Sequence, residues 1–164
     1  MLLNYFTAEY AVSVHKKIIE ISGGIEGVKN FGNIDSPLEH IQNDDYYPSF
    51  EEKLTHLVFS LNKNHAFNDG NKRSSIALGA FFIIVNGLDV FADKFIIEME
   101  NIAVTVADNI IDKDLLFEII FSLINEEDYN EALKVKIIDA LSQVQFEDNL
   151  SKIEMGTDFY KDVF

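Results

Sequence analysis

Cysteine and tryptophan are absent from this chain of 164 residues, and proline is limited to two. Without cysteine there is no disulfide, no thiolate ligand for a metal and no thiol nucleophile. So few prolines, together with only eight glycines, leave little material for long irregular loops. The longest strongly apolar run, residues 76–85, is too short to cross a bilayer, so no membrane segment is expected.

Positive charge is also scarce. The chain has 13 lysine and arginine residues against 28 aspartate and glutamate residues, which gives a formal net charge of −15. Binding to nucleic acid is not expected, because neutralising phosphates requires a basic surface. Residues 1–6 lack the basic and small-residue pattern of a signal peptide. With the absence of cysteine, this leads us to expect a cytoplasmic protein.

Apolar residues recur at helical spacing along most of the chain, which predicts one domain of the all-α class with about six helices. A capping-box pattern, Ser49 with Glu52, marks one helix start. One of the helices is apolar on every side in its middle, residues 76–85, and is predicted to be buried at the centre. The predicted helices cover residues 7–22, 49–64, 71–86, 94–107, 112–124 and 131–144.

Residues 23–48 show no clear period and contain both prolines. They are predicted to form a loop with a short helix near residues 38–41. A small hairpin within residues 28–48 is the alternative left open, and it would form a flap in front of the motif described next. Tyr46 and Tyr47 are candidates for lining such a flap.

The C-terminal part of the chain differs in charge. Residues 126–164 carry ten acidic residues against four lysines. They are predicted to be an acidic helical extension of the domain formed by residues 1–125, ending in a polar tail.

The most informative segment is His65-Ala66-Phe67-Asn68-Asp69-Gly70-Asn71-Lys72-Arg73, which contains the only arginine of the chain. Its residue types suit a phosphorylated substrate. Histidine is readily poised as a base near neutral pH, and aspartate can hold Mg²⁺ that also touches phosphate oxygens. Small residues that open a helix expose backbone N–H groups to an anion, while lysine and arginine neutralise phosphate charge.

This segment resembles the signature of the Fic/Doc family, and specifically of its Doc (death-on-curing) branch. Fic enzymes show H-x-F-x-D/E-G-N-G-R-x-x-R, whereas Doc proteins have a lysine in place of the second glycine. The present chain has Lys72 at that position and Ile76 in place of the second arginine. The resemblance extends over roughly residues 7–125.

The resemblance implies the Fic/Doc fold and the transfer of part of ATP, with Mg²⁺, to a hydroxyl group of a protein. His65 would take the proton from that hydroxyl, Phe67 would anchor the loop in the core, and Asp69 would hold Mg²⁺. The residues expected in catalysis are His65, Asp69, Lys72 and Arg73. Those expected to bind the nucleotide are Asn68, Gly70, Asn71, Lys72 and Arg73.

The Doc branch is associated with phosphorylation of translation elongation factor Tu, which arrests growth, and with a small antitoxin as partner. Lys72 adds charge where a glycine would leave bare backbone, and it would turn the nucleotide so that the γ-phosphate faces His65. Two alternatives stay open. One is an AMP transferase of the same fold, and the other is a catalytically silent nucleotide-binding module.

Other residues receive structural interpretations. His15 is predicted to lie at the surface, His56 to be semi-buried on a helix, and His40 to lie in the loop region. Ser22-Gly23-Gly24-Ile25-Glu26-Gly27 matches the S/T-x-x-x-E-G/N string of inhibitory helices in Fic proteins. Because its three glycines make a poor helix, the match is interpreted as accidental.

Overall fold

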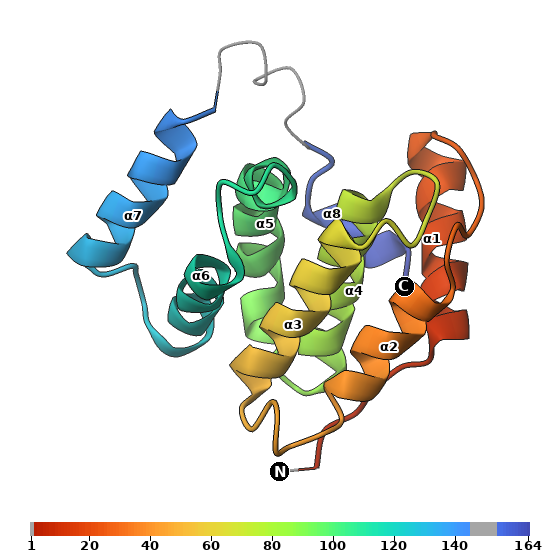
Figure 1. Ribbon diagram of the computed structural model, residues 1–164, viewed down its shortest axis with the longest axis horizontal. Helices are drawn as coiled ribbons and strands as arrows, with labels where there is room; N and C mark the ends of the chain where they lie inside the picture. Colours follow the sequence, from red (N-terminus) through yellow and green to blue (C-terminus); the bar gives the residue numbers. More distant parts are fainter. Residues whose placement is uncertain (1, 145–153) are drawn as a thin grey trace.

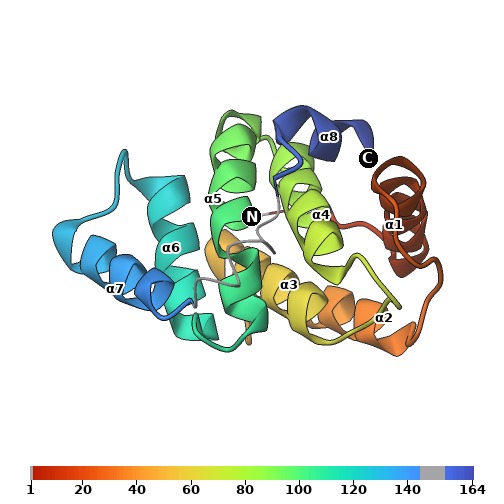
Figure 2. The same cartoon turned by 90° about the horizontal axis from the view of Figure 1, so that it is seen from above.

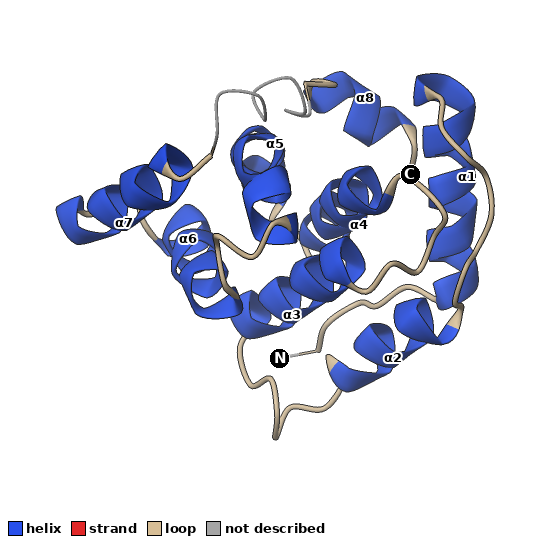
Figure 3. Ribbon diagram, turned by 45° about the horizontal axis from the view of Figure 1, so that its top comes forward, coloured by secondary structure: helices blue, strands red, loops and turns tan. Residues whose placement is uncertain are grey.

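A computed structural model of the chain describes residues 2–144 and 154–164, and in these ranges it contains eight α-helices and no β-strand (Figures 1 and 3). The predicted all-α class is therefore confirmed, with two helices besides the six predicted ranges, one of which lies where a short helix was expected. The elements are α1 (Ala8–Ser22), α2 (Gly32–His40), α3 (Phe50–Lys63), α4 (Asn71–Val85), the 3-10 turn η1 (Asp89–Phe91), α5 (Ala92–Ala107), α6 (Lys113–Asn125), α7 (Glu131–Ser142) and α8 (Thr157–Asp162).

Helix α4 lies at the centre of the fold, as its apolar sequence predicts (Figure 2). Side chains such as Ile76 and Phe82 are fully buried, and α1, α3, α5 and α8 all pack against this helix. Gly79 is the position where side chains of α3 and α5 approach the backbone of α4 most closely. A Cβ atom there would lie 2.7 Å from Phe95 Cζ and 2.8 Å from Val58 Cγ2. Helices α3 and α5 therefore pack directly against the backbone of α4.

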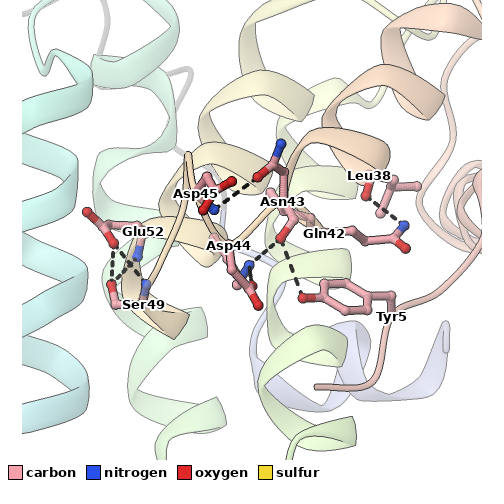
Figure 4. Close-up of polar contacts among 10 residues, drawn as sticks. Tyr5, Leu38, Gln42, Asn43, Asp44, Asp45, Ser49 and Glu52 are labelled. Atoms are coloured by element: carbon pink, nitrogen blue, oxygen red, sulfur yellow. Dashed lines mark hydrogen bonds and ion pairs between the residues drawn. The ribbon is translucent and has the colours of Figure 1, made fainter. Parts of the chain in front are cut away.

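Side-chain caps fix where the helices that flank the site begin. Thr7 accepts a hydrogen bond from the Tyr10 N–H at 3.1 Å at the start of α1. The predicted capping box is present at the start of α3 (Figure 4). There the Ser49 N–H donates to Glu52 Oε2 at 2.9 Å, and the Glu52 N–H donates to Ser49 Oγ at 3.2 Å. These caps satisfy N–H groups that the helices leave open.

Helix α2 corrects the prediction for residues 23–48. It covers Gly32–His40, so it begins well before the short helix expected near residues 38–41, and it includes His40. Pro37 lies inside it, and a proline at such a position indicates a break when only the sequence is considered. The helix forms because it buries Ile34 and Leu38 in the core.

The turn from α2 into α3 is held by its own polar groups (Figure 4). Gln42 Nε2 donates to the Leu38 carbonyl at 3.1 Å, and the Asp45 N–H donates to Asn43 Oδ1 at 2.9 Å. Helix α3 also holds the turn, because the Nζ of its buried Lys53 donates to the Ile41 carbonyl at 2.6 Å and to Asp44 Oδ1 at 2.7 Å.

Tyr46 and Tyr47 do not line a flap over the motif, because they precede the start of α3 whereas the motif follows its end. Tyr47 instead contacts His56. Its hydroxyl lies 3.0 Å from His56 Nδ1, and the two rings stack with centroids 4.5 Å apart. Lys113 Nζ lies 2.8 Å from the same nitrogen. His56 is partly buried, as predicted.

The end of the chain returns to the core. Helix α8 packs on α4 and α5, with Tyr160 and Val163 fully buried. The Phe164 ring lies 5.3 Å from that of Phe81 on α4. The polar tail predicted for this end is therefore wrong for residues 157–164. Helix α7, by contrast, lies at the edge of the molecule against α6 (Figure 2).

Part of the predicted extension, residues 145–153, lies outside the described residues. The division of the chain at residue 125 stays a prediction. In the described ranges, no helix combines the length and the hydropathy needed to cross a membrane.

The contacts of His56 predict an acid-dependent loss of stability. Burial, and then the charge of Lys113, lower the pKa of His56 to about 4, whereas an unfolded histidine titrates near 6.5. Between these pH values the unfolded chain binds more protons than the folded one, so the free energy of unfolding falls as the pH is lowered. We expect His56→Asn to reduce this fall by on the order of 2 kcal/mol. Urea denaturation at a series of pH values from 7 to 4.5 measures the free energy of unfolding of both proteins. Parallel curves of this free energy against pH would contradict the prediction.

Candidate active site

The predicted motif forms the loop between α3 and α4. His65 directly follows the C-cap residue of α3, Asn64, and its side chain is exposed. Its backbone φ of 49° lies in the left-handed region, which costs a non-glycine residue on the order of 1–3 kcal/mol. Such a conformation persists only where the surroundings fix it, so the position of His65 depends on the residues that hold the loop.

The loop is fixed to the core through Phe67 and Asn71. Phe67 is 1% exposed. Its N–H donates to Asn71 Oδ1 at 3.0 Å, and Asn71 Nδ2 donates back to the Phe67 carbonyl at 3.0 Å. The role predicted for Phe67 as an anchor agrees with this geometry. Because the Asn71 amide is occupied, this residue offers a ligand its backbone N–H rather than its side chain.

The segment after α1 runs antiparallel to the motif loop, and this pairing is found in place of the hairpin that was left open as an alternative. Val28 and Phe67 form an isolated antiparallel bridge. On either side of it the Asn68 N–H donates to the Gly27 carbonyl at 3.1 Å, and the Lys29 N–H donates to the Ala66 carbonyl at 2.8 Å. The Asn68 side chain also donates to the Glu26 carbonyl at 3.1 Å. The segment is not helical, so Glu26 is not part of an inhibitory helix.

Asp69 is held as a carboxylate by backbone donors. The Ile25 N–H donates to Oδ2 at 3.1 Å, and the Gly70 N–H donates to Oδ1 at 2.7 Å. These bonds, first the one from Ile25, lower the pKa of Asp69. Its side chain remains 42% exposed, so the ionised group is accessible to a cation.

Arg73 contacts Asp69 and the end of α1. Its Nη1 donates to Ser22 Oγ and, at 2.9 Å, to the Gly23 carbonyl, and its Nη2 lies 3.5 Å from Asp69 Oδ1. The only guanidinium of the chain thus ties the start of α4 to the end of α1, which lie side by side in Figure 1. This role was not predicted from the sequence.

The N-terminus of α4 presents unpaired donors. Gly70 is the N-cap residue, with a φ of 76°. Because glycine has no Cβ, it adopts this left-handed conformation without steric cost, and the chain can turn into the helix. In the described part of the chain, no group accepts from the N–H of Asn71, Lys72 or Arg73. Helix N-termini of this kind bind anions through the N–H groups and the helix dipole.

These groups meet at a cavity of about 510 Å³. It includes every predicted site residue except Arg73. The other four lining residues, from the end of α3 and from the end of α5 and beyond, were not predicted. The cavity is lined by Asn62, Lys63, His65, Asn68, Asp69, Gly70, Asn71, Lys72, Ala107 and Asn109.

Lys63 adds a second cation to the cavity. Its Nζ donates to the carbonyls of Val106 and Ala107, at 3.2 and 3.3 Å, and to Asn109 Oδ1. It therefore caps the C-terminus of α5, where a positive charge is favourable. Its position two residues before His65 is the only signal in the sequence that could have indicated this residue. Nothing in the sequence points to Asn109.

The residues present fit Mg²⁺ bound together with phosphate oxygens. In the described ranges, no group of three or more histidine, cysteine or carboxylate side chains forms a metal site. Mg²⁺ nevertheless commonly keeps several waters and uses one or two carboxylates plus substrate phosphates. Asp69 supplies such a carboxylate beside the free N–H groups of α4.

His15 was predicted to lie at the surface, but this prediction is wrong. Its side chain is 3% exposed and lies beneath the motif loop. Its Nε2 lies 2.7 Å from the Asp69 carbonyl oxygen, and its ring stacks on Phe67 with centroids 3.8 Å apart. Burial lowers the pKa of His15. The prediction relied on the neighbouring Lys16 and Lys17, which do face solvent. It failed because His15 itself lies on the buried side of α1.

Comparisons with known proteins agree with this geometry. Residues 5–83 match the Fic/DOC family. The chain is 33% identical over 96 residues to "Toxin Doc" of Mycolicibacterium smegmatis, covering 56% of this chain and 74% of that protein. It is 28% identical over 93 residues to "Protein kinase doc" of Escherichia phage P1, covering 54% of this chain and 73% of that protein. The chain therefore belongs to the Fic/Doc family, and its similarities lie with the Doc branch.

Proposed function

We propose that this protein is a Doc-type toxin that transfers the γ-phosphate of Mg²⁺–ATP to a hydroxyl group of a protein. The observation that carries the proposal is the single cavity in which His65, Asp69 and Lys72 surround the open N-terminus of α4. A base, a carboxylate for the metal, a cation and an anion-binding helix end are the components that phosphoryl transfer requires.

In the proposed reaction His65 takes the proton of the target hydroxyl. The hydroxyl oxygen attacks the γ-phosphorus, the bond from this phosphorus to the β–γ bridging oxygen breaks, and ADP leaves with that electron pair. The N–H groups of Asn71 and Lys72 bind phosphate oxygens. Mg²⁺ on Asp69 would neutralise part of the phosphate charge. Arg73 acts through its charge and through Asp69, because its Nη1 is engaged at the end of α1.

The nature of residue 72 favours transfer of phosphate over transfer of AMP. Lys72 lines the cavity at the position where Fic enzymes have glycine. A lysine there adds a charge and fills space that would otherwise admit a phosphate against the backbone. We therefore propose that the γ-phosphate, rather than the α-phosphate, lies next to His65.

The target and the partner are proposed from the association of the Doc branch with elongation factor Tu and with a small antitoxin, and the names of two relatives support the general class. One relative is named a toxin and another a protein kinase. Elongation factor Tu in the cytoplasm is the proposed target, and a small antitoxin protein is the proposed inhibitor. The absence of an inhibitory helix at Glu26 is consistent with inhibition by a separate chain.

Labelled ATP tests the proposed reaction. Purified protein, Mg²⁺ and bacterial lysate, or elongation factor Tu alone, are incubated with ATP labelled at either the α or the γ phosphate. We expect a protein band labelled only from γ-ATP, and a loss of at least about 100-fold in His65→Ala, because that is the typical contribution of a general base. Label from α-ATP would identify an AMP transferase. No label with elongation factor Tu or with lysate would favour the silent module.

Two adjacent glycines provide a matched test of Asp69. Both have positive φ, 83° for Gly23 and 122° for Gly24, so an alanine at either strains the backbone. At Gly24 the Cβ would lie 2.6 Å from Asp69 Oδ2, 3.1 Å from Ile19 Cδ1 and 3.2 Å from Arg73 Nη2, so the shortest contact is with the carboxylate, whereas at Gly23 nothing lies within 4 Å. We expect both variants to unfold at a lower temperature.

Only Gly24→Ala should raise the Mg²⁺ concentration for half-maximal transfer, by about ten-fold or more, as for other groups that orient a metal ligand. Kinetics at varied Mg²⁺ measure this difference. The same Mg²⁺ requirement in both variants would contradict the proposal that the present orientation of the Asp69 carboxylate is needed to hold the metal.

A further inference from the structure

His15 occupies a position that no step of the proposed reaction uses. It lies on α1, and its ring fills a slot between the Phe67 ring and the peptide unit that joins Asp69 to Gly70. The two rings are parallel to within 2°. The Asp69 carbonyl oxygen lies 2.7 Å from Nε2, so Nε2 carries the proton and donates it.

The peptide unit between Asp69 and Gly70 is therefore clamped at both ends. Its carbonyl accepts from His15, and its N–H donates to Asp69 Oδ1 at 2.7 Å. Because Gly70 has no side chain and is in the left-handed region, this unit could otherwise rotate at little steric cost. Rotation would turn the Gly70 N–H away from the Asp69 carboxylate and change the first turn of α4.

We propose that His15 is a positioning residue that locks the Asp69–Gly70 peptide unit, and through it sets the orientation of the Asp69 carboxylate toward Mg²⁺. The inference rests on the proposed function for its kinetic consequence. A phenylalanine would fill the same slot and stack on Phe67 without burying a polar ring. Compared with a phenylalanine, the imidazole of His15 adds the hydrogen bond to Asp69. Burying the polar imidazole is favourable only when this bond is made.

Two substitutions separate the hydrogen bond from the packing. His15→Phe keeps an aromatic ring on Phe67 and removes the donor. His15→Gln loses the ring and keeps an N–H donor at the position of Nε2. We expect His15→Phe to raise the Mg²⁺ concentration for half-maximal γ-phosphate transfer by about 10–100-fold, the usual effect of removing a group that orients a metal ligand. KM for ATP at saturating Mg²⁺ should change little, and His15→Gln should stay within a few-fold of the wild type.

A role in packing alone predicts the reverse order. His15→Gln would then be the more damaged variant, and His15→Phe would keep the wild-type Mg²⁺ requirement. Either of these results would overturn the proposal. Circular dichroism and melting temperatures show whether each variant is folded.

A binding measurement makes the test independent of transfer. MgCl₂ is titrated into each protein with the non-hydrolysable analogue AMP-PNP, and the rise in melting temperature is followed. If the wild type responds to Mg²⁺ but transfers no phosphate, the proposed function fails while the His15 proposal is judged on the shift between the variants. A response of His15→Phe equal to that of the wild type, or no response of the wild type to Mg²⁺, would overturn the proposal. In addition, ¹⁵N NMR at pH 7.5 should show the proton of His15 on Nε2.

Discussion

The site depends on the burial of α4. Because this helix is surrounded by α1, α3, α5 and α8, it cannot shift without opening the core. Its N-terminus emerges from that core at the cavity, so the N–H groups of its first turn are fixed donors rather than parts of a mobile loop. A phosphate that binds there meets an arrangement that is already in place, and such preorganisation is a main source of catalytic power.

The loop in front of α4 is held from three directions. Helix α1 contributes His15 below the loop, the segment after α1 contributes the Ile25 N–H and the bridge to Phe67, and α4 itself contributes Asn71 and Arg73. These contacts converge on the backbone of the loop and on Asp69. His65, in contrast, is left exposed in a strained backbone conformation, open to an incoming protein. The contacts of the fold thus converge on the groups proposed to hold phosphate, whereas the proposed base stays accessible.

The parts of this arrangement that the sequence predicted are those with a local signal. The helices around the motif have strong apolar periodicity, so the central helix could be predicted. The motif residues are contiguous, and six of the seven positions expected in catalysis or nucleotide binding do line one cavity. Three features have no such signal. The extent of α2 beyond the short helix expected near residues 38–41 is hidden by its proline, α8 is only six residues long, and His15 contacts the motif loop only through the packing of α1 beneath it. Arg73 was expected at the phosphates, but its contact with the end of α1 depends on the same packing.

The central claim is that the γ-phosphate of ATP lies next to His65, and a crystal structure of the protein with Mg²⁺ and AMP-PNP tests it most directly. We expect the γ-phosphate at the N–H groups of Asn71 and Lys72, with the adenosine directed away from His65. The α-phosphate at that position, with the γ-phosphate turned away from His65, would contradict it.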